Sequence, residues 1–219
     1  MLVHDWMTEH PITATPDSRI SSVVAEMARH HVRHVPVVRP DPAGAILVGI
    51  VSTYDVARAY PREINPWGNA RLPAGLDRPV ADVMTPDPIT VEPSTPIERA
   101  AHELVSRRIH ALPVVRAGRL VGMITGNDVT RAFVALLGPR SQGVRITFAL
   151  ATHEDVFGTV VALAKQHQVE LGSVVTAHHG GHRIAVVQVT GPQTPAFLDG
   201  IWASGHRVES VVYDEPVAA

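Results

Sequence analysis

The chain has 219 residues, of which 45% are hydrophobic and 18% are charged, and its formal net charge is -2 when the histidines are neutral. This composition is typical of a packed globular protein and excludes a fibrous or low-complexity chain. The near-neutral charge gives no field that would attract nucleic acid or an anionic membrane. The absence of cysteine excludes disulfides and thiolate metal sites.

The length allows more than one hydrophobic core, because single domains cluster at roughly 100 to 150 residues. The sequence contains no run of about 18 apolar residues that would span a membrane. Its N-terminus also lacks a basic flank followed by an apolar stretch. We therefore predict a cytoplasmic protein with neither nucleic acid nor a membrane as a partner.

An internal repeat organises the first two thirds of the chain. Met7-Thr8 and Pro11-Ile12-Thr13 return 77 positions later as Met84-Thr85 and Pro88-Ile89-Thr90. After a four-residue insertion in the first copy the offset becomes 73, at which Asp55 matches Asp128. Two runs of agreement separated by a plausible loop insertion indicate two copies of one supersecondary unit.

Each copy is predicted to fold as a helix, two strands and a helix. Ile20, Val23, Val24 and Met27 have the spacing of an apolar helix face, with Asp17 or Ser18 as the N-cap. In the second copy Thr95 is the predicted cap, Pro96 the first helical residue and Glu98 the end of a capping box. Strands are expected at 35–38 and 46–51, and again at 112–115 and 120–124.

The rest of the chain has a different pattern. Strands are expected at 145–150, 173–177, 184–189 and 208–213, with helices at 155–167 and from Thr194 to Gly205. The order βαββαβ is that of the ferredoxin-like split unit. The predicted divisions are a first repeat at 1–60, a Pro/Gly-rich linker at 61–79, a second repeat at 80–137, a linker at 138–143 and a last domain at 144–219.

The candidate chemistry lies where a strand ends and a helix begins. In both copies a hydroxyl residue is followed three positions later by an aspartate, as Ser52 with Asp55 and Thr125 with Asp128. One interpretation is a capping box. The other is a ligand site, because a helix start favours phosphate and a carboxylate there can accept hydrogen bonds from two ribose hydroxyls. Asp in place of the Glu or Gln usual in a capping box modestly favours the ligand site.

Several of these motifs, in order and twice, resemble a pair of cystathionine-β-synthase-type (CBS) domains. They are the Pro-Ile-Thr segments, the His34-Val35-Pro36-Val37-Val38 and Leu112-Pro113-Val114-Val115 strands, and the two Gly-x-x-Ser/Thr-x-x-Asp segments. The resemblance covers about residues 1–136. It implies an α/β (α+β) fold in which two pseudo-symmetric βαββα-type repeats form a disc whose clefts bind AMP, ADP, ATP or S-adenosylmethionine.

The resemblance also implies roles for individual residues. Asp55 and Asp128 would bind ribose, Ser52 and Thr125 would contact phosphate or ribose, and the backbone of Ile12-Thr13 and Ile89-Thr90 would face adenine. The basic residues Arg33, His34, Arg108 and His110 would neutralise phosphates or be solvated at the surface. The family often has a charged residue between the hydroxyl and the aspartate, where this chain has Thr53-Tyr54 and Gly126-Asn127. This difference predicts weaker phosphate binding or a single occupied cleft.

The C-terminal segment resembles an ACT-type regulatory domain, and the order of a CBS pair before it resembles bacterial acetoin-utilisation accessory proteins. The stretches 132–138 and 144–147 support this match. The usual Asp-x-Pro-Gly of ACT domains is here Asp155-Val156-Phe157-Gly158, which keeps the glycine and lacks the proline. Whether the domain binds an amino acid stays open.

A rival site is the turn that contains His178, His179 and His182, because neutral imidazole binds Zn, Cu or Ni. The two glycines between these histidines are also what a turn between strands requires. The chain shows no thiol nucleophile, no glycine-framed serine and no paired-carboxylate motif. We predict a regulatory sensor rather than an enzyme, with no metal, no obligatory cofactor and an adenine nucleotide as regulatory ligand. The alternatives are a ligand-free dimerisation scaffold or partner-binding module and, third, a metalloenzyme at the histidine turn.

A homodimer or larger homo-oligomer is also expected, because CBS pairs and ACT domains both self-associate. The βαββαβ order leaves one sheet face uncovered by its two helices, and the strands offer apolar side chains that must be buried somewhere: Ile146, Phe148, Val174, Val186 and Val211. A twofold partner would cover such a face. Nucleotide binding would then change the spacing of the two halves and relay occupancy without catalysis.

Overall fold

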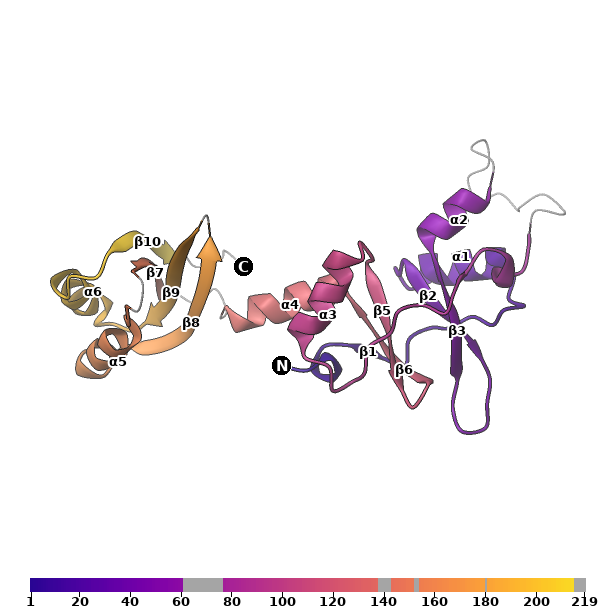
Figure 1. Cartoon of the computed structure of the whole chain (residues 1–219), viewed down its shortest axis with the longest axis horizontal. Coiled ribbons are helices and arrows are strands. Elements are labelled where there is room, and N and C mark those ends of the chain that lie inside the picture. The colour runs from indigo at the N-terminus through magenta and orange to yellow at the C-terminus, as the bar shows by residue number, and fades with distance from the viewer. Residues whose placement is uncertain (61–76, 138–142, 152–153, 180, 215–219) are drawn as a thin grey trace. The chain divides into compact units, whose positions relative to one another are not determined.

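The computed structural model describes residues 1–60, 77–137, 143–151, 154–179 and 181–214. They form two compact units, Met1–Thr130 and Arg131–Ala219, each with its own sheet (Figure 1). Among the described residues, no helix is both long enough and apolar enough to cross a membrane.

The first unit contains the two repeats except for the end of the last helix, which continues into the second unit, and the predicted helix–strand–strand–helix order is confirmed in each. The first repeat consists of α1 (Ile20–Arg29), β2 (His34–Arg39), β3 (Ile46–Ser52) and α2 (Thr53–Ala59). The second consists of α3 (Ile97–Ser106), β5 (Ala111–Arg116), β6 (Arg119–Thr125) and α4 (Gly126–Leu136). Each repeat is also preceded by a 3-10 turn and a two-residue strand that the sequence patterns did not predict: η1 (Val3–Asp5) with β1 (Thr8–Glu9), and η2 (Val80–Asp82) with β4 (Thr85–Pro86).

These short strands cross between the repeats. The β1 strand of the first repeat pairs with β6 of the second, with Thr8 opposite Met123. Reciprocally, β4 of the second repeat pairs with β3 of the first, with Thr85 opposite Ile50. The two central strands meet at equivalent positions, Ile46 and Arg119, which places the pseudo-twofold axis between them. Each repeat therefore completes the sheet of the other.

Two equivalent glycines permit this crossing. A Cβ atom on Gly49 would lie 2.6 Å from Met84 Sδ and 3.1 Å from the Thr85 carbonyl oxygen. A Cβ atom on Gly122 would lie 2.6 Å from Met7 Sδ and 3.0 Å from the Thr8 carbonyl oxygen. The crossing strands thus approach so closely that any side chain at these positions would displace a neighbour.

The starts of α1 and α3 differ from the prediction. Arg19 and Pro96 occupy the N-cap positions, and neither makes a side-chain capping bond. The hydroxyls of Ser18 and Thr95 instead accept hydrogen bonds from backbone N–H groups three residues before them, at 2.9 and 3.0 Å. The predicted caps Asp17 or Ser18 and Thr95, and the capping box with Glu98, are therefore wrong, because a tight turn uses the hydroxyls before the helix begins.

The start of α1 is capped by Asp77, a residue near the end of the predicted linker. Asp77 Oδ1 accepts the backbone N–H of Ser21 at 3.0 Å, and its Oδ2 accepts the Ser21 hydroxyl at 2.8 Å. The predicted apolar face of α1 is confirmed, since Ile20, Val23, Val24 and Met27 are all buried in the core of the first repeat.

The second unit has the predicted succession of strands and helices. It consists of β7 (Gly143–Leu150), α5 (Phe157–Gln166), β8 (Glu170–His179), β9 (His182–Thr190), α6 (Thr194–Ala203) and β10 (Val208–Asp214). The strands form an antiparallel sheet in the order β10-β7-β9-β8. Alternate residues of β7 are buried in one core with Val160 of α5 and with Phe197 and Ile201 of α6.

The apolar strand residues predicted to need burial divide between the two faces of the sheet. Ile146 and Phe148 are fully buried in the core, and Val211 packs against it. Val186 is opposite Thr147 in the register and is half-buried. Because side chains alternate between the two faces of a strand, these residues cannot share one face.

Candidate functional site

A cleft of about 610 Å³ lies in the first unit and is built from both repeats. The first repeat contributes the residues before β2, the end of β3 and the start of α2. The second contributes the segment after β4 and the residues before β5. The lining residues are Arg33, His34, Ile50, Ser52, Thr53, Tyr54, Asp55, Thr85, Asp87, Pro88, Ile89, Arg108, Ile109, His110 and Ala111.

The crossed pairing of strands creates this cleft. Because β4 pairs with β3, the segment 87–89 of the second repeat lies beside the end of β3 in the first. The chain then returns to its own sheet at Val91, whose N–H donates to the Pro113 carbonyl at 3.1 Å. Ile89 therefore lies where the chain passes from one repeat to the other, which brings it to Ser52 and Asp55.

Ser52 and Asp55 form the capping box at the start of α2. Asp55 Oδ2 accepts the Ser52 backbone N–H at 2.8 Å and the Ser52 hydroxyl at 2.6 Å. The Asp55 N–H in turn donates to Ser52 Oγ at 3.2 Å. Asp55 Oδ1 has no hydrogen-bond partner among the described residues, so one carboxylate oxygen caps the helix and the other can accept a ligand hydroxyl.

The second copy repeats this geometry. Thr125 donates its N–H and its hydroxyl to Asp128 Oδ2 at 2.8 and 2.7 Å. Here the aspartate is 6% exposed, whereas Asp55 is half-buried. The strand β1 pairs with β6, which directly precedes this second helix start. After β1 the chain continues to Ile12 and Thr13.

The predicted site residues thus form two groups, and Thr90 belongs to neither. Seven line the cleft described above: Arg33, His34, Ser52, Asp55, Ile89, Arg108 and His110. Ile12, Thr13, Thr125 and Asp128 belong to the equivalent position in the other repeat and do not line this cleft. Thr90 is exposed next to Ile89 and does not line it either.

The cleft carries basic and acidic groups from both repeats. Arg33, Arg108, His34 and His110 face it together with Asp55 and Asp87. The rings of His34 and His110, one from each repeat, have centroids 6.4 Å apart. Burial lowers the pKa of His34, His110 and Arg33 lower it further, and only Asp55 opposes them. The neutral imidazole is therefore favoured at His34.

Two residues of the cleft have left-handed backbone conformations. Arg108 has φ 54° and Asp87 has φ 44°, as do their equivalents His31 and His10 with 54° and 48°. Residues other than glycine adopt this region uncommonly, and such positions are concentrated at functional sites. The two conformations direct the chain into the turns that carry Pro88 and Ile109 to the cleft.

Sequence reasoning missed several lining residues, of which Ile50, Ile109, Tyr54 and Asp87 are chemically informative. Ile50, Ile89 and Ile109 provide apolar surface for a planar base. Tyr54 is 68% exposed, and the Arg58 guanidinium lies 5.7 Å from its ring centroid. Asp87 and Pro88 directly precede Ile89, so the sequence could have assigned residues 87–89 to the site together.

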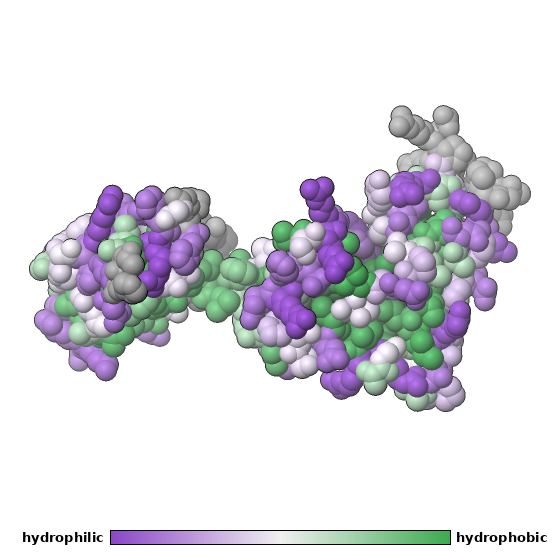
Figure 2. All heavy atoms as spheres, viewed as in Figure 1, coloured by the Kyte–Doolittle hydropathy of each residue, from purple (hydrophilic) through white to green (hydrophobic). Residues whose placement is uncertain are grey.

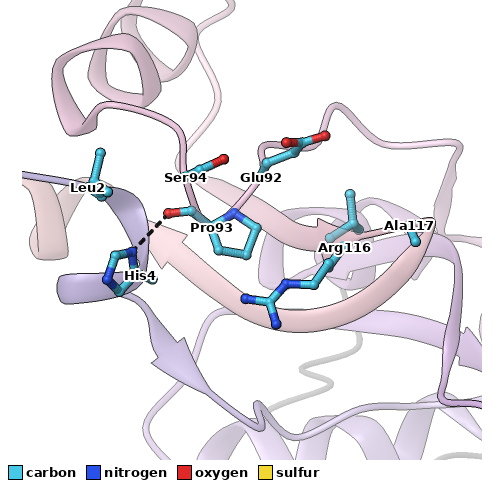
Figure 3. Close-up of a pocket in the computed structure, with 8 residues that line it drawn as sticks. Leu2, His4, Glu92, Pro93, Ser94, Arg116 and Ala117 are labelled. Atoms are coloured by element: carbon cyan, nitrogen blue, oxygen red, sulfur yellow. Dashed lines mark hydrogen bonds between the residues drawn. The ribbon is translucent and has the colours of Figure 1, made fainter.

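Another cavity, of about 340 Å³, lies where the N-terminal segment meets the second repeat (Figure 3). His4 Nδ1 is 3.3 Å from the Pro93 carbonyl oxygen, and Val3 donates its N–H to the Thr95 carbonyl at 2.9 Å. This segment is therefore attached to the second repeat before β1 begins. Among the described residues, no group of three His, Cys, Asp or Glu side chains is placed to hold a metal ion.

Comparison with curated proteins gives partial matches. The chain is 29% identical over 133 residues to the L-aspartate semialdehyde sulfurtransferase of Methanocaldococcus jannaschii, which covers 60% of this chain and 23% of that protein. It is 33% identical over 122 residues to the mitochondrial CBS domain-containing protein CBSX3 of Arabidopsis thaliana, with 55% of each chain covered. The chain thus spans about a quarter of the length of the first of these relatives.

Solved structures match a similar share of the chain. CBSX2 in complex with AMP is 29% identical, with a TM-score of 0.51 over 62% of this chain and 98% of that one. The CBS domain pair of protein MJ0100, in complex with 5′-methylthioadenosine and S-adenosyl-L-methionine, is 29% identical, with a TM-score of 0.51 over 62% and 97%. A Vibrio cholerae protein assigned to acetoin utilization (AcuB) is 31% identical, with a TM-score of 0.52 over 63% and 93%.

The CBS domain family model matches residues 3–62 and 80–135, which are the two repeats. These ranges include the strands and helix starts that form the cleft. With more than half of its length matched in this way, the chain belongs to the CBS domain family.

Proposed function

We propose that this chain is a regulatory sensor that binds an adenosine-type ligand, AMP, ADP, ATP or S-adenosylmethionine, in its CBS clefts. The observation that carries the proposal is the cleft between the repeats, where a carboxylate oxygen with no partner among the described residues, apolar side chains and basic groups converge. Solved CBS pairs of similar fold support it, since they are complexes with AMP or with 5′-methylthioadenosine and S-adenosylmethionine.

Each group in the cleft then has a role. Asp55 Oδ1 accepts the ribose hydroxyls, while the N–H groups at the start of α2 and the Ser52 hydroxyl face phosphate or ribose. Ile50 and the backbone of Ile89 contact adenine, and Arg33, Arg108, His34 and His110 neutralise phosphate. In the equivalent cleft Asp128, Thr125 and the Ile12-Thr13 backbone take the corresponding roles.

The second unit relays the occupancy. Its βαββαβ order and its sheet order are those of a split βαβ unit, which supports a ferredoxin-like, ACT-type domain. The chain acts without catalysis of its own and without an obligatory cofactor, and it signals as a homodimer or larger homo-oligomer.

A ligand panel tests the sensor proposal. Thermal unfolding is followed with AMP, ADP, ATP, S-adenosylmethionine and, as a control nucleotide, CMP, each at millimolar concentration. A ligand at 100 times its Kd stabilises the folded state by about 2.7 kcal/mol, which raises Tm by roughly 2 to 4 °C in a protein of this size. If none of the adenosine compounds raises Tm, the proposal is wrong.

A second candidate, a ligand-free dimerisation scaffold, is favoured by the exposed apolar side chains of α4. Phe133, Val134 and Leu136 are 52, 59 and 51% exposed, and Figure 2 shows apolar residues gathered over this helix. If the oligomer has the same dissociation constant and the same sedimentation coefficient with each ligand of the panel as without ligand, the chain is a scaffold.

A further inference from the structure

The pair formed by His34 and His110 gives the cleft a property beyond ligand recognition. His34 is the first residue of β2 in the first repeat, and His110 directly precedes β5 in the second. Their ring centroids are 6.4 Å apart, and both line the cleft together with Arg33 and Arg108. Four groups that are or can be cationic therefore face one space of about 610 Å³.

Burial and the groups around His34 favour its neutral imidazole when the cleft holds no anion. From the first repeat, Arg33, Asp55 and the Tyr54 phenol face the same space. From the second, Arg108 and Asp87 face it. The first turn of α4, which contains Asp128, is attached to His110, because the Gly126 N–H donates to the His110 carbonyl at 3.2 Å. Of these acidic groups only Asp55 raises the pKa of His34, and its effect is smaller than those of burial, His110 and Arg33, which lower it.

A phosphate group would reverse this balance. An anion between the two arginines attracts a proton to the nearest imidazole, because an opposite charge at about 4 to 6 Å favours the charged form of a titratable group. His34 starts from a lowered pKa, with burial as the main cause and the charges of His110 and Arg33 as further causes. It therefore has a proton to gain near neutral pH, where histidine normally titrates.

We propose that His34, beside His110 of the other repeat, couples anion binding in this cleft to proton uptake, so that the chain senses acidity together with its ligand. This inference rests on the proposed adenosine site for the identity of the ligand, but its chemistry requires only a phosphate between Arg33 and Arg108. A neutral adenosine ligand such as 5′-methylthioadenosine takes up no proton, whereas AMP does.

The sign of the linkage follows from the two states. His34 is less protonated in the free cleft and more protonated in the anion-bound cleft. Affinity for AMP therefore rises as pH falls through the pKa values of the free and bound states. A rise of one unit in the pKa of His34 on binding corresponds to a tenfold difference in affinity between pH values above and below both pKa values, or about 1.4 kcal/mol.

The experiment is a titration of the imidazole resonances by nuclear magnetic resonance between pH 5 and 8.5. It is done on the full chain alone, with inorganic pyrophosphate, with AMP and with 5′-methylthioadenosine. The variants His34→Asn and His110→Asn assign the two resonances. His102→Asn, at an exposed position of α3, is the matched control, and its thermal unfolding and AMP affinity should equal those of the wild type.

The expected result is a His34 pKa that rises by about one unit or more with pyrophosphate and with AMP and that stays unchanged with 5′-methylthioadenosine. Calorimetry with AMP in two buffers of different ionisation enthalpy should show that the wild type takes up more protons than His34→Asn. This comparison cancels the titration of AMP itself.

The outcomes separate the two proposals. If AMP binds and the pKa of His34 does not change, the proton coupling is wrong and the adenosine site stands. If pyrophosphate raises the pKa and no adenosine compound binds, the coupling stands and the adenosine site is wrong. If neither anion changes the titration of His34, the coupling is wrong, whatever binds elsewhere in the chain.

Discussion

At the residue scale, Asp55 combines a structural bond with a free acceptor. Its Oδ2 accepts two hydrogen bonds from Ser52, while Oδ1 has no partner among the described residues. An Asp55→Asn variant keeps an oxygen for the cap but replaces the second acceptor with an amide donor. The role of the residue in stability can therefore be separated from its role in binding.

We expect Asp55→Asn to lower adenosine-ligand affinity by about 10- to 100-fold, because a hydrogen bond to a charged group contributes roughly 1.5 to 3 kcal/mol. The free energy of unfolding should change by no more than about 1 kcal/mol, since the capping geometry is kept. Titration calorimetry and urea unfolding measure the two quantities. Asp17→Asn, at an exposed position outside the cleft, serves as control, and equal affinities for the two variants would remove Asp55 from the site.

Gly122 is a second residue whose identity the crossing of strands determines. Gly122→Ala should destabilise the fold by about 1 to 3 kcal/mol, because the new methyl group overlaps Met7 Sδ and approaches the Thr8 carbonyl. Urea unfolding measures the loss. Gly126→Ala is the matched control, since a Cβ atom there meets nothing within 4 Å.

Met7 provides an internal check on this explanation. If the overlap with Met7 is the cause, adding Met7→Ala to Gly122→Ala should recover part of the loss, and the two substitutions should be non-additive by about 0.5 kcal/mol or more. Strict additivity would show that the methyl group acts in another way.

At the element scale, Asp77 stabilises the start of α1 from a position 56 residues away in sequence from Ser21. Asp77→Ala should lower the free energy of unfolding by about 1 kcal/mol, the usual contribution of a helix cap. Asp17→Ala, the cap that local sequence rules select, should have little effect. Urea unfolding of both variants decides between them, and a larger loss at Asp17 would restore the local cap.

In the second unit, Glu154 joins the end of β7 to the turn before β10. Glu154 Oε1 is 2.5 Å from His206 Nδ1, and its Oε2 accepts the Ala151 N–H at 2.8 Å. The bond from His206 and then the bond from Ala151 lower the pKa of Glu154. The stabilisation is therefore fully present above the unfolded-state pKa of about 4.3 and is lost as pH falls through the lower folded-state pKa.

We accordingly expect Glu154→Gln to be less stable than the wild type at pH 7, with a smaller difference below about pH 4. Urea unfolding at pH 7 and at pH 3 measures both. Glu209→Gln, an exposed glutamate of β10, is the control for a loss of charge. A difference that is the same at both pH values would show that ionisation of Glu154 is not involved.

The sequence was most informative about elements that local spacing determines. The helix α1 with its buried Ile20 and Met27, the strand pairs and the strand–helix succession of the second unit follow from periodicity and turn residues. Caps and crossing strands did not follow, because the partners of Ser21 and Thr8 lie far along the chain. In the site, the repeated hydroxyl-x-x-Asp motif located Ser52 and Asp55, and the resemblance to CBS domains located Ile89. Lining residues such as Ile109 and Tyr54 are brought in only by tertiary structure.

At the scale of the whole molecule, the apolar side chains of α4 predict self-association. Phe133, Val134 and Leu136 lie around one side of the helix, and each is about half exposed. We expect the full chain to sediment as a homodimer or larger at micromolar concentration, because burying such side chains against a second copy is favourable.

Phe133→Asp should shift this equilibrium toward the monomer, whereas Ala135→Asp, on the opposite side of α4, should leave it unchanged. Analytical ultracentrifugation with and without AMP measures the association. A wild-type monomer in both conditions would rule out the dimer and with it the relay through subunit spacing.

The reciprocal pairing of β1 with β6 and of β4 with β3 has a consequence for biosynthesis. Thr8 leaves the ribosome 115 residues before its partner Met123, an interval of roughly 6 to 23 s at translation rates of about 5 to 20 residues per second. Throughout that time the nascent first repeat has an open sheet edge at β3 and an unplaced N-terminal segment. The native sheet can close only after the second repeat has been translated, so a gene split between the repeats would yield two polypeptides that each need the other in order to fold.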